Sequence, residues 1–131
     1  QQMNILVDSD FLVALYKPDD SNHHKATKIF RKLESVNFSA LNIVFQEATT
    51  VISKRMNMSH ARKFHDSISR LISNEIKLDN ILEENSWKIF LSQTKKGTSF
   101  VDCANLAAME YYKLDGILSF DEFYKNKRIK S

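Results

Sequence analysis

The sequence predicts an α/β fold, a three-layer α/β/α arrangement in which helices flank a short central parallel sheet. Short apolar runs of strand length alternate with longer segments whose apolar residues recur at helical spacing. This alternation is typical of parallel sheets that carry helices on both faces. The chain has only 2 Gly and 1 Pro in 131 residues, so tight turns are few and helices should dominate.

The chain begins with a predicted strand and two predicted helices. Residues 5–7 form the short apolar run of a buried strand, and residues 11–16 predict a helix that starts near the end of that strand. Asp20 or Ser21 should cap a second helix, whose apolar face consists of Ala26, Ile29, Phe30 and Leu33.

A second strand and two further helices follow. Residues 38–41 predict the strand, and Asn42 should cap the helix after it. Val44, Glu47, Ala48 and Val51 recur at helical spacing, which predicts that Glu47 lies on the apolar stripe. Another helix should begin at Met58 and Ser59, with an apolar side made of Ala61, Phe64, Ile68, Leu71 and Ile72.

The third predicted strand is short and precedes a capped helix. Residues 76–78 predict the strand, and Asn80 with Glu83 resembles a capping box. Gly97 should end the helix that this box begins.

The last predicted helix and strand lie near the carboxyl end of the chain. Ser99 with Asp102 repeats the capping-box spacing at the start of a segment rich in Ala and Leu. Residues 117–119 predict the final strand, which Phe120 and Asp121 follow at once. Residues 125–130 form a basic tail that we expect to be loosely held.

Length and composition indicate one globular domain, which we expect to span residues 3–131. Hydrophobic residues make up 43% of the chain and charged residues 27%, which is enough apolar matter for one core. Gln1 and Gln2 precede Met3 and are compatible with a remnant of expression.

The sequence favours a cytoplasmic protein. Cys103 is the single cysteine and cannot form an internal disulfide, which suits a reducing compartment. No apolar run approaches the roughly 18 residues that cross a bilayer, and no leader pattern precedes the first strand. The net charge of +3 is only weak evidence for a nucleic-acid partner.

Four acidic side chains stand in apolar sequence: Asp8, Glu47, Asp102 and Asp121. Ionised carboxylates are rare in apolar surroundings unless they are paired or bind a cation. Asp8 and Asp121 follow predicted strands, and ligands of open parallel sheets bind beyond the carboxyl ends of the strands. Carboxylates that converge there would repel one another, and a divalent cation relieves that repulsion.

The acidic set predicts a metal-dependent hydrolase. Mg²⁺ and Mn²⁺ prefer oxygen ligands, and ions held by carboxylates can activate water for phosphodiester cleavage without a covalent nucleophile. No P-loop, HExxH or Ser/Cys nucleophile motif stands out in the chain.

Four segments, in this order, resemble the PIN-domain ribonucleases. In size, the chain is similar to the VapC-type toxins of toxin–antitoxin pairs. The segments are Val7-Asp8-Ser9, Phe45-Gln46-Glu47-Ala48, Ser99-Phe100-Val101-Asp102 and Ser119-Phe120-Asp121-Glu122-Phe123.

The resemblance implies a PIN-like fold and metal-dependent endonucleolytic cleavage of single-stranded RNA. It also implies Mg²⁺ or Mn²⁺ as cofactor, a homodimer, and a cognate antitoxin that occludes the site. It assigns metal binding and positioning of the attacking water to Asp8, Glu47, Asp102 and Asp121. Ser9 and Ser119 would orient those carboxylates through hydrogen bonds.

Asp10 departs from the family pattern, which often has Asn, Ser or another small polar residue at this position. It either adds a fifth acid to the site or caps the first helix. The four main acids also have structural explanations. Asp8 and Asp102 could be helix caps, Asp121 a turn residue, and Glu47 a partner of a nearby base such as Lys54 or Arg55.

Two other functions remain open from the sequence. Asp8-Ser9-Asp10 resembles the start of haloacid-dehalogenase-like phosphatases, although the downstream Lys and paired acidic motif of those longer chains do not match. A non-catalytic PIN-like module that binds RNA or protein is the third hypothesis, and the complete acidic set argues against it.

Aromatic and basic residues near the predicted site have two interpretations each. Four aromatic residues either stack on RNA bases or line an apolar groove for a partner helix: Tyr111, Tyr112, Phe123 and Tyr124. The bases either contact phosphates or form a solvated face: Lys54, Arg55, Lys95, Lys96 and the 125–130 tail.

Overall fold

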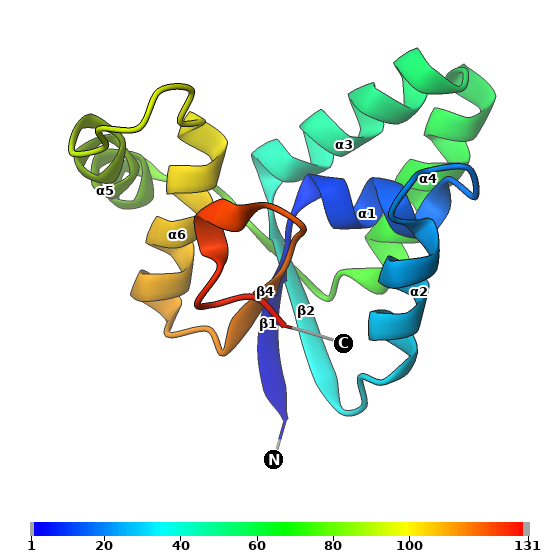
Figure 1. Cartoon of the computed structure of the whole chain (residues 1–131), viewed down its shortest axis with the longest axis horizontal. Coiled ribbons are helices and arrows are strands. Elements are labelled where there is room, and N and C mark those ends of the chain that lie inside the picture. The colour runs from blue at the N-terminus through cyan, green and yellow to red at the C-terminus, as the bar shows by residue number, and fades with distance from the viewer. Residues whose placement is uncertain (1, 130–131) are drawn as a thin grey trace.

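A four-stranded parallel sheet forms the centre of the structure, which is a computed structural model (Figure 1). It describes residues 2–129, so Gln1 and the end of the basic tail lie outside the described residues. The strand order is β3-β2-β1-β4. The strands are β1 (Met3–Val7), β2 (Val36–Leu41), β3 (Asn74–Ile76) and β4 (Gly116–Leu118).

Helices cover both faces of the sheet (Figure 1). One face carries α1 (Ser9–Tyr16), α2 (His23–Arg31), α3 (Asn42–Arg55) and α4 (Met58–Leu71); the other carries α5 (Asn80–Leu91) and α6 (Phe100–Tyr112). From β1 to β3 the chain moves across the sheet in one direction, and from β3 to β4 it returns. Right-handed crossovers place the helices of opposite moves on opposite faces. The predicted three-layer α/β fold is confirmed.

The order of the strands reverses at β1, and this reversal positions the site. β1 lies between β2 and β4 and pairs in parallel with both. Val7 lies opposite Leu118, and the Asp8 amide donates to the Leu118 carbonyl at 3.0 Å. The chain segments that leave β1 and β4 therefore start side by side, at the place where open parallel sheets bind ligands.

Several element boundaries differ from those predicted. Asn42 does not cap α3 as expected: it is the first residue of the helix, and Leu41 is the cap. The Asn42 side chain instead accepts a hydrogen bond from the Leu78 amide at 3.0 Å. The predicted third strand at residues 76–78 is shifted, because Asn74–Ile76 is the segment in register with β2.

Two helix signals are also displaced. Asp79 caps α5 by accepting from the Leu82 amide at 3.0 Å, so the cap lies one residue before the expected Asn80. The helix ends at Leu91, and Gly97, with a φ of 87°, lies in the loop that follows. Gly adopts a positive φ without steric strain, and Gly97 uses this freedom in the loop. It does not end the helix, which stops before this loop.

The carboxyl-terminal segment is held more firmly than expected. After β4 comes the short helix η1 (Glu122–Tyr124), and the chain then returns alongside β4. The Ile117 amide donates to the Lys127 carbonyl at 3.0 Å, and the Ile129 amide donates to the Ile117 carbonyl at 2.9 Å. The prediction of a loosely held tail is therefore wrong for residues 125–129.

The core fills the space between the sheet and its helices. Ile5, Leu6 and Val7 are buried because helices cover both faces of β1. On the side of α1 and α4, the fully buried ring of Phe64 packs edge-on against Tyr16, with ring centroids 5.3 Å apart. Within residues 2–129, no helix is long and apolar enough to cross a membrane.

Replacing Phe64 by Ala should lower the free energy of unfolding by about 3–5 kcal/mol, because it leaves a cavity between α1 and α4. Urea denaturation followed by circular dichroism measures this loss. Leu91→Ala is the control, since that side chain is 74% exposed and should change the same quantity by less than about 0.5 kcal/mol. A similar small effect for both variants would contradict this packing.

Candidate active site

Asp8 is the centre of a polar network at the carboxyl edge of the sheet. Its side chain is 5% exposed and caps α1 by accepting from the Ser9 amide at 2.9 Å. The same oxygen, Oδ1, accepts from Asn105 Nδ2 at 3.1 Å, and Oδ2 accepts from Ser119 Oγ at 2.9 Å. Asp8 therefore joins α1, α6 and the loop after β4.

Glu47 reaches the same region from α3. Its Oε1 accepts from Ser9 Oγ at 2.6 Å. The side chain is exposed, so the prediction that Glu47 lies on the apolar stripe is wrong. The buried stripe of α3 consists of Val44, Phe45, Ala48 and Ile52. Glu47 lies beside that stripe because successive residues of a helix are rotated by about 100°. Its side chain lines a cavity.

The suggested pairing of Glu47 with a base of its own helix is not what the structure shows. Arg55 lies 3.7 Å from Asp20 instead. Glu47 and Arg55 both line an open cavity of about 400 Å³ that also includes Ser9 and Asp10.

Asp102 lies in the first turn of α6 and is half-buried. Ser99 caps this helix alone, by accepting from the Val101 amide at 3.1 Å. The Asp102 carboxylate turns toward the site, where its Oδ1 accepts from the Tyr124 hydroxyl at 3.0 Å.

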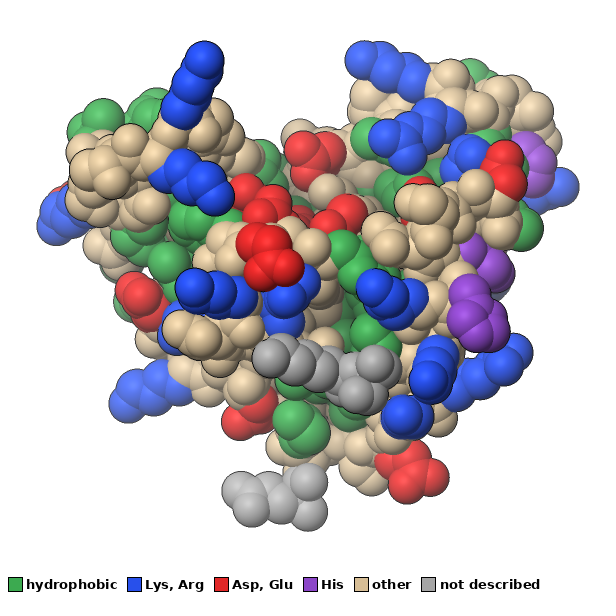
Figure 2. Space-filling view, in the orientation of Figure 1, with side chains coloured by type: hydrophobic (Ala, Val, Ile, Leu, Met, Phe, Trp, Pro, Cys, Tyr) green, Lys and Arg blue, Asp and Glu red, His purple; other side chains and the backbone are tan. Residues whose placement is uncertain are grey.

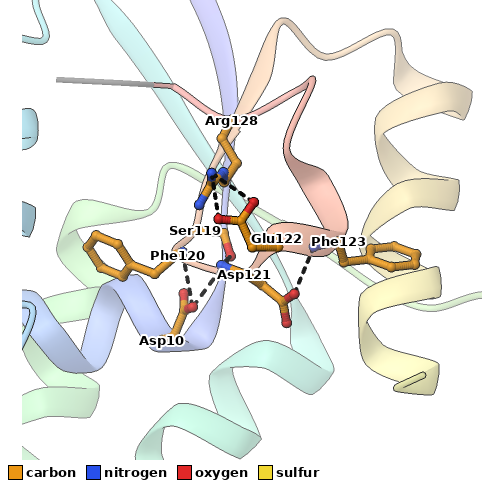
Figure 3. Close-up of polar contacts among 7 residues, drawn as sticks. All are labelled: Asp10, Ser119, Phe120, Asp121, Glu122, Phe123 and Arg128. Carbon is orange, nitrogen blue, oxygen red and sulfur yellow. Dashed lines mark hydrogen bonds and ion pairs between the residues drawn. The ribbon is translucent and has the colours of Figure 1, made fainter. Parts of the chain in front are cut away.

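Asp121 is exposed and caps η1 by accepting from the Phe123 amide at 2.9 Å (Figure 3). Its own amide donates to Ser119 Oγ at 3.1 Å. Ser119 thus accepts from Asp121 and donates to Asp8, and a single hydroxyl connects the two predicted site residues.

Asp10 ties α1 to the loop after β4. Its Oδ2 accepts from the Phe120 amide at 3.0 Å and lies 3.4 Å from Ser119 Oγ (Figure 3). The rings of Phe11 and Phe120 stack beside this contact, with centroids 5.5 Å apart. Asp8, and not Asp10, is the cap of α1, so Asp10 brings a fifth acid to this edge of the sheet.

The carboxylates influence one another's ionisation. Burial raises the pKa of Asp8 to about 7, and the charges of Asp10 and Glu47 add to this effect. Burial likewise raises the pKa of Asp10 to about 6, with a contribution from Asp121. Burial and the charges of Asp8 and Asp121 raise the pKa of Asp102 to about 7. These mutual effects agree with the hydrogen bonds that bring the five acids to one region.

The donor atoms of the acidic region suit a hard divalent cation. The converging donors are carboxylate oxygens, which Mg²⁺ and Mn²⁺ prefer. Within the described part of the chain, Asp10 Oδ1 is a buried oxygen with no hydrogen-bond partner. As the side chains lie, no three acidic, His or Cys residues among residues 2–129 are arranged to hold a metal ion. Glu47, Asp102 and Asp121 are each turned onto a donor of the protein.

The acidic region lies in a hollow with basic rims. Figure 2 shows acidic side chains on the floor between two lobes that carry Lys and Arg. On one side, Lys95, Lys96 and Lys125 line a cavity together with Asp102 and Asp121. Arg55 lines the cavity of Glu47 and Asp10.

Two residues of the network were not predicted as site residues. Asn105 is fully buried, and its Nδ2 lies 3.1 Å from both Asp8 Oδ1 and the Tyr124 hydroxyl. Tyr124 is 2% exposed, so it neither stacks on a free base nor lines an open groove. One signal in the sequence was a polar Asn three residues after Asp102, on the same side of an Ala-rich helix.

The metal-free protein should lose stability as the pH rises from about 4 to about 7. Because Asp8, Asp10 and Asp102 have raised pKa values when folded, the folded state binds more protons than the unfolded chain in this range. Thermal melts in EDTA at pH 4.5 and pH 7.5 measure this effect.

Asp102→Asn should raise the melting temperature at pH 7.5, by about 3 °C or more, and less at pH 4.5. A variant that melts below the parent at pH 7.5 would contradict a repulsive cluster.

Comparison with known proteins extends these observations. The chain shares its fold with VapC20 of Mycobacterium tuberculosis, a toxin that cleaves the sarcin–ricin loop, with a TM-score of 0.82 and 22% identity over 93% of each chain. It is also similar to a chain of VapBC2 from Rickettsia felis, solved with a DNA fragment from its promoter. The TM-score there is 0.65 and the identity 11%, over 95% of this chain and 93% of the other.

No curated protein matches the sequence significantly. The model of the PIN domain family, however, matches residues 5–130. This match covers nearly the whole chain, including all five converging acids, and the chain therefore belongs to the PIN domain family.

Proposed function

We propose that residues 3–131 form a single PIN-like nuclease domain, a Mg²⁺- or Mn²⁺-dependent endoribonuclease that cleaves single-stranded RNA. The observation that carries the proposal is that five acids lie together at the carboxyl edge of the sheet: Asp8, Asp10, Glu47, Asp102 and Asp121. Hydrogen bonds through Ser9, Ser119, Asn105 and Tyr124 connect them. Membership of the PIN domain family supports it.

Asp8, Glu47, Asp102 and Asp121 would hold the cation through their carboxylate oxygens. A divalent cation bound there would supply a Lewis acid that lowers the pKa of a water and stabilises the leaving oxygen. The chain's own part is to fix the carboxylates: Ser9 donates to Glu47 at 2.6 Å, and Ser119 donates to Asp8 at 2.9 Å. Both serine protons are committed to acids, so neither serine is arranged as a nucleophile.

The basic rims of the hollow would bind the RNA backbone. Lys95, Lys96 and Lys125 line the cavity that contains Asp102 and Asp121. Lysines placed there attract phosphates from solution, although the floor itself repels them unless a cation is bound. The arrangement therefore suits a polyanion that approaches together with the metal ion.

Contacts within the described residues do not favour the phosphatase alternative. In that mechanism the second Asp of the Asp8-Ser9-Asp10 segment acts as acid and base on the substrate. Here the Asp10 Oδ2 accepts from the Phe120 amide and holds the loop after β4. A non-catalytic module is disfavoured by the convergence of all the predicted acids.

The chain would act as the toxin of a type II toxin–antitoxin pair in the cytoplasm. The fold shared with VapC20 and with a chain of VapBC2 supports this assignment. A homodimer and a cognate antitoxin belong to the same proposal. Exposed apolar side chains that such partners could cover include Trp87, Leu91, Tyr111 and Tyr112. Light scattering of the purified protein tests the dimer.

Asp8→Asn should abolish cleavage with the fold intact, because it removes one charge from the cation site at nearly constant shape. We expect kcat/KM to fall by about two orders of magnitude or more. The assay uses a labelled single-stranded RNA, and an RNA with the sarcin–ricin loop sequence, with Mn²⁺, Mg²⁺ or EDTA. EDTA should stop the parent enzyme.

Asp66→Asn is the matched control. It removes the same charge from an exposed position on α4, where Asp66 pairs with Arg70 at 2.9 Å. Undiminished cleavage by Asp8→Asn, with an unchanged circular dichroism spectrum, would reject the assignment. A small phosphate ester is tested alongside, and its hydrolysis without RNA cleavage would favour the phosphatase.

Replacing Lys95 and Lys96 together by Ala should weaken RNA binding without slowing the chemical step. The logarithm of the RNA association constant falls linearly with the logarithm of the salt concentration. Removing a lysine that pairs with an RNA phosphate should make this slope less steep by about 0.7 for a single strand. RNA binding by the Asp8→Asn protein with and without the two lysines, measured by fluorescence anisotropy at several salt concentrations, tests this. Lys63→Ala, at an exposed site on α4, should leave the slope unchanged. An unaltered slope in the Lys95 and Lys96 variant would remove this rim from the RNA path.

A further inference from the structure

The hydroxyl group of Tyr124 lies in a buried position, in contact with Asp102 and Asn105. Tyr124 is the last residue of η1, and its side chain is 2% exposed. The hydroxyl oxygen lies 3.0 Å from Asp102 Oδ1, 3.3 Å from the Asp102 carbonyl oxygen, and 3.1 Å from Asn105 Nδ2. All of its polar contacts in the described residues are thus with Asp102 and Asn105.

The chemistry of these groups fixes the direction of each hydrogen bond. An amide nitrogen such as Asn105 Nδ2 can only donate, so it donates to the tyrosine oxygen. The tyrosine proton is then free for Asp102, whose carboxylate oxygen accepts. The second proton of Asn105 Nδ2 is donated to Asp8 Oδ1 at 3.1 Å. With the amide reversed, an oxygen would face the Asp8 carboxylate, and two acceptors would oppose each other.

These bonds form a continuous path between two carboxylates that repel each other. It runs from Asp102 through Tyr124 and Asn105 to Asp8. The path fixes one oxygen of Asp102 on α6 and one oxygen of Asp8 after β1. A carboxylate with one oxygen fixed cannot rotate freely, so both groups are oriented before any cation arrives.

Packing alone does not require this hydroxyl. The ring of Tyr124 packs edge-on against Phe123, with centroids 5.1 Å apart, and a phenylalanine ring could make the same contact. A buried hydroxyl is costly unless it is hydrogen-bonded. Its partners here are a site acid and the amide that contacts another site acid. The hydroxyl is therefore placed to serve the site.

We propose that Tyr124 is a positioning residue that orients Asp102 directly, and Asp8 through Asn105, for binding of a divalent cation. The proposal rests on the function proposed above, because it takes these two acids to be cation ligands. Tyr124 itself touches neither the cation nor the RNA in this role.

The test is calorimetric binding of Mn²⁺, without RNA, to the parent and to Tyr124→Phe. The variant should bind Mn²⁺ about 10-fold more weakly, as is typical when a group that orients a ligand is removed. Tyr16→Phe is the matched control, since it removes a hydroxyl that lies 2.8 Å from His60, between α1 and α4. Its Mn²⁺ affinity should equal that of the parent.

Cleavage assays add a second readout. For Tyr124→Phe, the Mn²⁺ concentration that gives half-maximal cleavage should rise about 10-fold, while the KM for RNA at saturating Mn²⁺ stays unchanged. A lower melting temperature with unchanged Mn²⁺ affinity would mean that the hydroxyl only stabilises the fold, and would overturn the proposal.

Asn105→Ala keeps the proposal testable if Tyr124→Phe does not fold. It interrupts the path at its middle and should also weaken Mn²⁺ binding. Where both variants fold, the double variant should show a smaller drop in affinity than the product of the two single effects, because both remove the same path. Independent, fully multiplicative effects would overturn the path between Tyr124 and Asp8.

The outcomes separate this proposal from the function on which it rests. A parent protein that binds no Mn²⁺ would reject the cation site itself, and the role of Tyr124 with it. A parent that binds Mn²⁺ and cleaves RNA, together with a Tyr124→Phe variant that binds equally well, would reject only the role of Tyr124.

Discussion

The parallel pairing of β1 with β4 determines where the acidic side chains meet. Val7 lies opposite Leu118, so the chain leaves both strands at the same edge of the sheet. Asp8 and Ser119 are then close enough for a hydrogen bond of 2.9 Å, and Ser119 accepts in turn from the Asp121 amide. The hydrogen bond from the Phe120 amide to Asp10, at 3.0 Å, reinforces this placement. The helices contribute the remaining acids around that fixed pair.

Repulsion among the acids of the site lowers the stability of the folded protein. Burial and neighbouring charges raise the pKa of Asp8 and Asp102 to about 7, which means that ionising them costs free energy in the folded protein. Donors such as the Ser9 amide and the Ser119 hydroxyl offset part of this cost at Asp8. A bound cation would offset more. The same crowding that suits a cation therefore makes the metal-free protein less stable at neutral pH.

The sequence predicted the architecture and the strand-end acids because both depend on local patterns. An apolar run followed by Asp shows where Asp8 leaves the sheet, and the same holds for Asp121. Glu47 was misplaced because a helical pattern does not show where the neighbouring elements end, and α3 is only partly covered beside it. Exact helix starts failed where two adjacent polar residues could both cap, as at Asp79 and Asn80. The contact between Asn105 and Tyr124 joins distant segments, and no local pattern carries it.

The pairing of the first strand with the last also bears on how the protein is made. Synthesis proceeds from the amino terminus, so β1, β2 and β3 are available on the ribosome before β4. At that stage Asp8 lacks Ser119, and Asp121 has not been added. A nascent chain that still lacks β4 and the loop after it therefore cannot assemble the acidic site. All residues of the site are present outside the translating ribosome only after the segment through Tyr124 has emerged.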